Sequence, residues 1–217
     1  MSAPAFASVI LDVDSTVSGI EGIDWLAERR GPVVAQEVAA LTDRAMRGEI
    51  ALEDVYGARL ALVRPDRDGI DVLSREYIAN IAPGCADTIA RILSAGIEVK
   101  LVSGGLRPAI LPLAEFLHLG PGDLFAVDIQ LDGHGEYASF EATSPLTTAS
   151  GKQAVVESMG VRRPAIAVGD ASTDLAMRPA VDCFACFTGF RHRDAIVRRA
   201  DLVVATFDEL LHVVLPP

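Results

Sequence analysis

The sequence predicts an α/β protein in which a parallel sheet is flanked by helices and interrupted by a helical insertion. Three observations lead to this fold class. Residues 6–11 form a short, β-branched apolar run that is typical of a buried strand. Residues 20–80 carry apolar residues at helical spacing and no convincing strand. From residue 81 onward, helix-like and strand-like segments alternate, as they do in a parallel sheet with crossover helices.

The elements follow in order along the chain. Helices are expected in the insertion at residues 24–30, 33–46, 52–63 and 70–81. After Pro83 and Gly84 we expect a helix at 85–95, a strand at 97–102, a helix after Pro108, and strands at 124–131 and 136–140 joined by a hairpin turn. A helix after Lys152 and strands at 164–169, 181–187 and 201–206 complete the chain. We therefore assign residues 1–16 and 80–217 to an α/β core and residues 17–79 to a helical cap.

The composition limits the partners of the chain. A formal net charge of −11, with no cluster of Lys and Arg, argues against a nucleic-acid partner. The longest apolar stretches fall short of the roughly 20 residues of a membrane span, and the N-terminus lacks the pattern of a signal peptide, so we expect no membrane partner and a cytoplasmic location. Three cysteines argue against a disulfide framework, and Cys183 and Cys186 are interpreted as core residues. A monomer and a homodimer both remain open.

Polar residues follow several of the predicted strands. The carboxyl ends of parallel strands meet at one edge of a sheet, so we expect these side chains to converge in one crevice. The set contains four carboxyls, one hydroxyl, one ammonium and a glycine-rich backbone: Asp12, Asp14, Ser103, Gly104, Gly105, Lys152, Asp170 and Asp174.

This set is suited to phosphoryl transfer. Crowded carboxylates need protons or a cation to neutralise them, and Mg²⁺ prefers oxygen ligands and accepts a phosphate as a further ligand. We expect Ser103 to Gly105 to open a helix and form an anion nest, with Ser103 able to cap that helix, and Lys152 to add a positive charge. Asp12 could then attack phosphorus, while Asp14 gives a proton to the leaving alcohol and later takes one from water. Asp174 alone reads equally well as an ordinary first-turn acid of a helix.

The segments "DVDST", "SGG", "SGK" and "GDASTD", in that order, resemble the four motifs of the haloacid dehalogenase (HAD) superfamily. Further segments, including "ILDVDSTVSGIEGIDWLA", "VKLVSGGLRP" and "HGEYASF", are similar to the phosphoserine phosphatase family within it. The resemblance covers nearly the whole chain. It implies a Rossmann-like core with an inserted helical cap, a Mg²⁺ cofactor, and hydrolysis of O-phospho-L-serine through an aspartyl-phosphate, the last step of serine biosynthesis.

The resemblance also implies roles for individual residues. Asp12 matches the nucleophile and a metal ligand, Asp14 the acid/base that also gives its backbone carbonyl to the metal, and Asp170 the remaining metal ligand. Asp174 matches the carboxylate beside the metal and the lysine, while Ser103, Gly104 and Lys152 match phosphate-binding residues. In the cap, Glu21 matches the acid that meets the substrate ammonium and Arg59 the arginine that meets its carboxylate. Lesser substrate contacts are implied for three residues, Met46, Gly105 and Thr173.

Three positions depart from the family pattern and keep other substrates open. Leu52 stands where an aromatic residue is usual, Arg47 replaces a small residue, and Ala171 stands where glycine is usual. Another small phosphorylated amine or alcohol is therefore the main alternative. A receiver-like signalling module is the remote one, since such a domain also phosphorylates an aspartate at a strand end but needs neither the insertion nor Asp14.

Two expectations concern the surroundings of the site. Arg107 is interpreted as a surface residue, and Arg191–Arg193 as a solvated turn. The cap is expected to close over the core, with hinges near Ser18–Gly19 and Ala82–Gly84, because a phosphorylated aspartate must be shielded from stray water.

Overall fold

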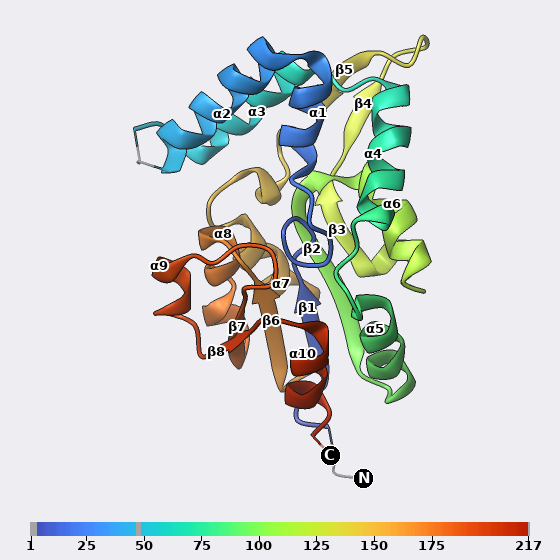
Figure 1. Cartoon of the computed structure of the whole chain (residues 1–217), viewed down its shortest axis with the longest axis vertical. Helices are drawn as coiled ribbons and strands as arrows, with labels where there is room; N and C mark the ends of the chain where they lie inside the picture. The colour runs from blue at the N-terminus through green and yellow to red at the C-terminus, as the bar shows by residue number, and fades with distance from the viewer. Residues whose placement is uncertain (1–3, 47–48, 217) are drawn as a thin grey trace.

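A six-stranded parallel sheet forms the centre of the protein, in a computed structural model that describes residues 4–46 and 49–216 (Figure 1). The strand order is β3-β2-β1-β6-β7-β8, which confirms the predicted α/β class. The strands are β1 (Ser8–Leu11), β2 (Glu98–Leu106), β3 (Leu124–Val127), β6 (Ala165–Gly169), β7 (Cys183–Phe187) and β8 (Leu202–Val204).

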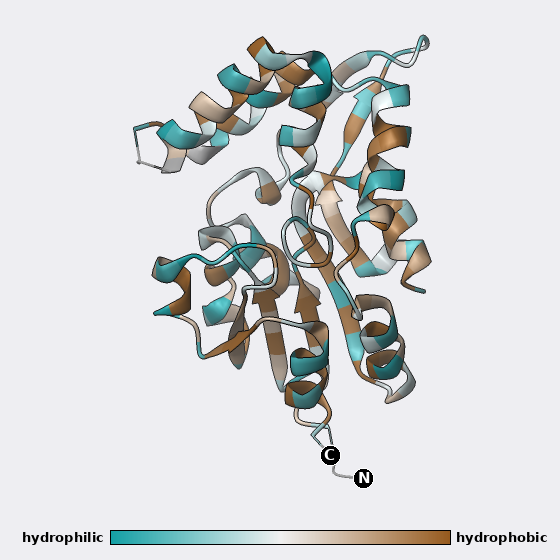
Figure 2. Ribbon diagram, in the orientation of Figure 1, coloured by the Kyte–Doolittle hydropathy of each residue, from teal (hydrophilic) through white to brown (hydrophobic). Residues whose placement is uncertain are grey.

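Strand β1 occupies the middle of the sheet, between β2 and β6. Its last residue, Leu11, pairs with Leu101 on one side and Val168 on the other. All four of its residues are buried, which explains why the segment reads as a continuous apolar run. Figure 2 shows the most hydrophobic residues on these central strands, so the core of the protein surrounds the strands that lead to Asp12.

Helices flank the sheet, and α5, α6, α7 and α10 contact it directly. They include α5 (Cys85–Ser94), α6 (Arg107–Phe116), α7 (Gly151–Met159), α8 (Ser172–Leu175), α9 (Asp194–Val197) and α10 (Phe207–Val214). Short 3-10 turns lie at Pro121–Asp123, Pro145–Thr147 and Arg178–Ala180. None of the helices in the described ranges is long and apolar enough to cross a membrane.

The four expected helices of the insertion are present. They are α1 (Gly22–Arg30), α2 (Pro32–Met46), α3 (Leu52–Val63) and α4 (Arg67–Ala79). Helices α1–α3 lie together at the end of the molecule opposite the two chain ends, whereas α4 packs against α6 (Figure 1). Asp66 caps α4 by accepting a 2.7 Å hydrogen bond from the Gly69 N–H.

The expected strand at residues 124–131 is wrong, because this segment divides at Asp128 between two sheets. Strand β3 pairs with β2 in the main sheet, whereas β4 (Ile129–Leu131) pairs antiparallel with β5 (Tyr137–Phe140). The hairpin then joins the insertion, since Gly135 accepts a 2.9 Å hydrogen bond from the Arg67 N–H. The apolar pattern continues across Asp128 because β3 has buried side chains in the main sheet and β4 has half-buried ones in the hairpin.

The chain enters and leaves the insertion through two segments that lie side by side. The Gly19 N–H donates to the Asn80 carbonyl, and the Ala82 N–H donates to the Val17 carbonyl, both at 2.9 Å. The buried hydroxyl of Ser18 donates to the Tyr77 carbonyl, also at 2.9 Å. Hydrogen bonds therefore join the two segments of the junction, and Ser18 in the first of them forms an isolated β-bridge with Asp14.

Candidate active site

The sheet brings the sequence-predicted polar residues to one edge. Asp12 follows β1 directly, and Asp170 follows the neighbouring strand β6. Ser103 lies in β2 on the other side of β1. Lys152 stands in the first turn of α7 and Asp174 in α8. The crevice expected from the topology is thus built from three adjacent strands and the two helices beside them.

The ammonium of Lys152 connects two of the carboxyls. Its Nζ lies 2.5 Å from Asp12 Oδ1 and 2.6 Å from Asp174 Oδ1. Asp12, Lys152 and Asp174 are 4%, 6% and 0% exposed, so this is a buried charge network. Low exposure strengthens each attraction and makes an unpartnered member costly. Lys152 reaches the site because Gly151 runs against the chain before it, where a Cβ would lie 1.7 Å from the Pro145 carbonyl oxygen.

Asp174 is fixed by the backbone that precedes it. Its Oδ2 accepts hydrogen bonds from the N–H groups of Asp170 (3.0 Å) and Ala171 (2.8 Å). Gly169 makes room for this, because a Cβ there would lie 2.3 Å from Asp174 Cγ. Asp174 is a first-turn acid of α8, as one interpretation expects, and its contact with Lys152 is compatible with the other. One oxygen binds the start of a short helical turn, and the other holds Lys152.

Asp170 has a cationic partner that the sequence interpretation missed. The Nε of Arg193 donates to Asp170 Oδ2 at 3.0 Å. On the same loop, the Nε of Arg191 lies 3.5 Å from Glu21 Oε1. The expectation of a solvated turn at Arg191–Arg193 holds for the exposed Arg191 but is wrong for Arg193, which is half-buried against Asp170. The loop after β7 brings Arg193 to the carboxyl end of β6. The sequence of a short charge run does not show whether its side chains are solvated or contact a buried carboxyl.

The donor chemistry of the cluster fits a divalent cation. Asp12, Asp170 and Asp174 each offer a carboxylate oxygen, and these three atoms lie within 4.8 Å of one another. Together with Asp14, four carboxyls meet here. Among the described residues, the cations bonded to these carboxyls are those of Lys152 and Arg193. If all four carboxyls ionise, two negative charges are left, the charge of one hard divalent ion with oxygen ligands.

The pKa values of the carboxyls are raised first by burial and then by neighbouring negative charge. Burial raises the pKa of Asp14 to about 7, with repulsion from Glu21 as the next cause. Burial and the Asp174 charge raise the pKa of Asp170 to about 6. Burial and Asp174 also raise the pKa of Asp12, against the attraction of Lys152. Lys152 keeps its proton firmly, because the neighbouring carboxylates raise its pKa and outweigh its burial.

Ser103, Gly104 and Gly105 lie within a strand, so the expectation that they open a helix is wrong. Strand β2 continues to Leu106, and α6 begins at Arg107. The Ser103 hydroxyl does not cap α6, since its Oγ accepts a 2.9 Å hydrogen bond from the Gly105 N–H. The segment still borders the site, and Tyr56 of α3 joins it by donating to the Gly104 carbonyl at 2.8 Å.

The carboxyl of Asp14 points away from the lysine network. The hydroxyl of Tyr77 donates to Asp14 Oδ1 at 2.6 Å, and the backbone N–H of Gly22 is a second donor to this carboxyl. Tyr77 is fully buried in α4, and the sequence interpretation missed it. The available signal was indirect, because a tyrosine on the apolar face of a helix needs a partner for its hydroxyl.

Glu21 and Arg59 are both connected to the start of α1 in the insertion. Glu21 precedes α1 and accepts a 2.8 Å hydrogen bond from the Ser15 hydroxyl. Arg59 of α3 forms an ion pair with Asp24 in the first turn of α1, at 2.7 Å. The Nε of Arg59 is buried without a hydrogen-bond partner in the described structure. A charged donor left in this state is placed to receive an anionic group.

The remaining predicted contacts are only partly described. Thr173 is half-buried in α8 beside Asp174. The side chains of Met46 and Leu52 and the whole of Arg47 lie outside the described residues. Arg107 donates to the Pro121 carbonyl, so it ties α6 to the following turn, as a surface residue would.

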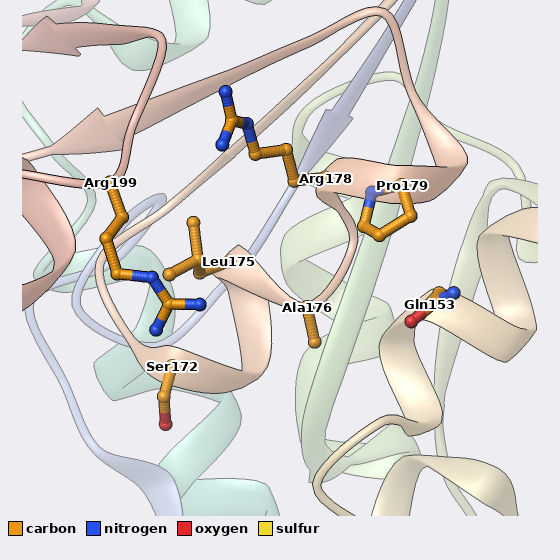
Figure 3. A pocket seen from close by; sticks show the side chains of 7 residues that line it. All are labelled: Gln153, Ser172, Leu175, Ala176, Arg178, Pro179 and Arg199. Atoms are coloured by element: carbon orange, nitrogen blue, oxygen red, sulfur yellow. The ribbon is translucent and has the colours of Figure 1, made fainter.

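A surface cavity of about 510 Å³ lies beside α7 and α8 (Figure 3). It is lined by Gln153, Ser172, Leu175, Ala176, Arg178, Pro179 and Arg199. Gln153 and Ser172 belong to the same helices as Lys152 and Asp174, but they face outward. The cluster itself is closed off, in agreement with its low exposure.

Curated relatives match the chain over most of its length. Phosphoserine phosphatase of Rattus norvegicus is 34% identical over 207 residues, covering 94% of this chain and 91% of that protein. Phosphoserine phosphatase of Homo sapiens is 33% identical with the same coverage. Chloroplastic phosphoserine phosphatase of Arabidopsis thaliana is 32% identical over 94% of this chain and 70% of that protein. No family model matches the chain.

Solved structures share the fold. A phosphoserine phosphohydrolase-like protein from Francisella tularensis has a TM-score of 0.84 at 23% identity, covering 96% of this chain and 99% of that one. A phospho-aspartyl intermediate analogue of phosphoserine phosphatase has a TM-score of 0.79 at 24% identity, covering 96% and 98%. DsGPDH of Dunaliella salina has a TM-score of 0.79 at 31% identity, covering 94% of this chain and 35% of that one.

Proposed function

Because this chain belongs to the phosphoserine phosphatase family of phosphomonoester hydrolases, we propose that it hydrolyses O-phospho-L-serine to L-serine and phosphate, the last step of serine biosynthesis. The observation that supports this most directly is the buried network in which Lys152 bonds both Asp12 and Asp174 at the end of β1. In this network the Asp12 carboxyl lies beside a protonated lysine, in the position where a phosphate ester would meet it.

Asp12 is the proposed nucleophile. Its oxygen attacks phosphorus and forms an aspartyl-phosphate, while the bond from phosphorus to the seryl oxygen breaks. Asp14 donates a proton to that leaving oxygen. In the second half of the reaction Asp14 takes a proton from the attacking water, which restores the free carboxylate of Asp12. A pKa of about 7 suits Asp14 to both roles near neutral pH.

The other groups of the site act by charge and position. Lys152 favours the ionised form of Asp12 against the effect of burial and stabilises charge on the transferring phosphoryl group, with Asp174 orienting it. Ser103 and the backbone of Gly104 and Gly105 are proposed to bind phosphate oxygens. Thr173, at the start of α8, is a further proposed contact.

We propose Mg²⁺ as the cofactor, held by the carboxylates of Asp12 and Asp170 and the backbone carbonyl of Asp14. Such an ion would supply positive charge to stabilise the phosphoryl group during its transfer. The excess negative charge of the carboxyl cluster supports this assignment. Arg193 holds one oxygen of Asp170 and thereby fixes the direction of the other.

The insertion is proposed to read the amino acid. The unpartnered Nε of Arg59 is a donor for the substrate carboxylate, and Glu21 is an acceptor for its ammonium. Asp24, in the first turn of α1, keeps Arg59 near the start of that helix, which Glu21 precedes. Gly105 and Met46 complete the proposed substrate contacts.

One observation favours a second candidate, a small phosphorylated alcohol without an amino group. Arg191 Nε lies 3.5 Å from Glu21 Oε1, so a cation already faces the acid that would bind an ammonium.

A cytoplasmic location also stays a prediction, and the three free cysteines are in accord with it.

The test is phosphate release from O-phospho-L-serine, O-phosphoethanolamine, glycerol phosphate and phenyl phosphate, each with Mg²⁺ and with EDTA. Asp12→Asn serves as the inactive control, and Arg59→Ala tests the carboxylate reader. We expect preference for O-phospho-L-serine, activity only with Mg²⁺, and a fall in kcat/KM of about 100-fold for Arg59→Ala on this substrate, the cost of one charge-assisted contact.

Two outcomes would change the proposal. Preference for glycerol phosphate would keep the roles of Asp12 and Lys152 and reject those of Glu21 and Arg59. A stable phosphorylated protein that does not turn over would indicate the receiver-like signalling role instead.

A further inference from the structure

Tyr77 reaches the reaction site from an unexpected direction. It is the only tyrosine among the described residues whose hydroxyl bonds one of the four clustered carboxyls, at 2.6 Å from Asp14 Oδ1. It lies outside the four sequence motifs and belongs to α4, the last helix of the insertion. Its side chain has no solvent exposure, so the hydroxyl is fully committed to this contact.

The surroundings are shaped around this hydroxyl. A Cβ at Gly22 would lie 2.1 Å from the Tyr77 hydroxyl oxygen, and a Cβ at Gly105 would lie 3.3 Å from it. Two glycines from different elements therefore leave the space that the phenol fills. If the Tyr77 hydroxyl only filled space in the core, it would not need glycine at both positions, one of them in β2 beside Ser103.

Tyr77 is also held from its backbone side. Its carbonyl accepts the 2.9 Å hydrogen bond from the Ser18 hydroxyl, and its helix packs against α6 of the core. The backbone of Tyr77 is thus held at the junction of the insertion and by the packing of α4 on the core helix α6. The hydroxyl itself also meets the start of α1, at Gly22.

We propose that Tyr77 is a positioning residue that assigns the two oxygens of Asp14 different tasks. The phenolic O–H donates to Oδ1, so Oδ1 is occupied as an acceptor. In this assignment the Gly22 N–H shares Oδ1 with the phenol, and the exchangeable proton of Asp14 is carried on Oδ2, towards the leaving alcohol. In the forward step that proton moves from Oδ2 to the seryl oxygen, and Tyr77 keeps its own proton throughout.

This role rests on the proposed function, and it predicts a selective defect. A leaving alcohol such as serine needs the proton of Asp14 as its bond to phosphorus breaks, whereas phenolate leaves readily without one. Loss of the Tyr77 hydroxyl should therefore slow alkyl esters and spare aryl esters. General loosening of the site would slow both.

The experiment compares Tyr77→Phe with the wild type in kcat/KM for O-phospho-L-serine and for phenyl phosphate. Tyr137→Phe is the matched control, because Tyr137 packs under Arg64 in the hairpin, away from the carboxyls. For Tyr77→Phe we expect a loss of about 10-fold on O-phospho-L-serine, part of the range for a general acid, and less than about 2-fold on phenyl phosphate. The KM for O-phospho-L-serine should stay within about 2-fold, since Asp14 acts on bond cleavage.

Gly22→Ala provides a second variant if Tyr77→Phe folds poorly. The new methyl group displaces the hydroxyl without removing it, so the same alkyl-selective loss is expected. Equal losses on both esters, or no loss for Tyr77→Phe in an active protein, would overturn the positioning role alone. A wild-type protein without Mg²⁺-dependent turnover would instead overturn the proposed function and with it the premise of this role.

Discussion

Single side chains determine how this site carries its charge. Lys152 is buried between Asp12 and Asp174, and no other cation among the described residues bonds either of them. Removing one member of a buried network leaves uncompensated charge, which costs more than the pair contributes. The same carboxyls would therefore destabilise the fold if the lysine were lost.

Lys152→Met tests this at constant side-chain length. We expect a loss of about 3–5 kcal/mol in the free energy of unfolding of the metal-free protein, because two buried carboxyls lose their partner. Phosphatase activity should be lost as well. Urea unfolding followed by circular dichroism measures the first effect. Lys100→Met is the control, since Lys100 pairs with Asp123 near the surface at 2.7 Å and such pairs contribute about 0–1 kcal/mol. Equal losses for both variants would contradict the role given to Lys152.

The raised pKa values of Asp14 and Asp170 link stability to pH in the metal-free protein. Both carboxyls titrate near pH 4 when unfolded, but at about 7 and about 6 when folded. The folded state therefore holds protons that the unfolded state has released, so these groups lower stability as pH rises from about 4 to about 7. The proposed Mg²⁺ would supply the positive charge that the protons supply at lower pH.

The measurement is the Tm with Mg²⁺ and with EDTA at about pH 5 and about pH 7.5. We expect Mg²⁺ to raise the Tm more at the higher pH, by about 2–4 °C for each kcal/mol of added stabilisation in a chain of this size. Mn²⁺ can replace Mg²⁺ to show that the effect follows divalent charge. A gain in Tm that is equal at both pH values would exclude the carboxyl cluster as its source.

At the scale of elements, the turn after β6 joins the sheet to the charge network. Gly169 ends the strand, and the next residues present two N–H groups to Asp174. The side chain of Asp174 occupies the space where a Cβ of residue 169 would lie. The strand and the network therefore cannot be changed independently.

Gly169→Ala should break this connection. The added methyl would lie 2.3 Å from Asp174 Cγ, so Asp174 must move and release Lys152. We expect a loss of about 1–3 kcal/mol in stability, as for other overpacked sites, together with a fall in kcat of about 10-fold or more. Gly122→Ala is the matched control, because no heavy atom lies within 4 Å of the place that its added methyl would take. Wild-type activity in Gly169→Ala would show that the position of Asp174 is not critical.

Elements whose pattern is local were predictable from the sequence. Strands β1 and β6 read correctly because they are buried on both faces, and the helices of the insertion because their apolar spacing is regular. The segment at 124–131 was not, since its apolar pattern does not reveal that Asp128 divides it between two sheets. The partners Tyr77, Asp24 and Arg193 were missed because each meets the site through long-range packing.

At the scale of the whole molecule, the clustered carboxyls are enclosed, so a substrate cannot reach Asp12 from solvent in this conformation. Asp12 is 4% exposed, and neither described cavity is lined by it or by Lys152. A phosphate ester must therefore gain entry by movement of the elements above the cluster. Helices α1–α3 are the natural moving part, since α4 packs on the core helix α6 and carries Tyr77 (Figure 1). This refines the expected cap of residues 17–79 into a proposal that most of the motion lies before α4.

Hydrogen exchange by mass spectrometry tests this division. With Mg²⁺ and beryllium fluoride as a phosphate mimic, we expect amides of α1–α3 to exchange about 10-fold or more slowly, because closure of this part suppresses local opening. Amides of α4 should change less, since the packing of α4 on α6 is the same in both states. Asp12→Asn is the control, as it removes the carboxylate that the mimic would occupy. Equal protection of α4 and α1–α3 would mean that the whole insertion moves as one body. No change in either would show that ester entry uses another route.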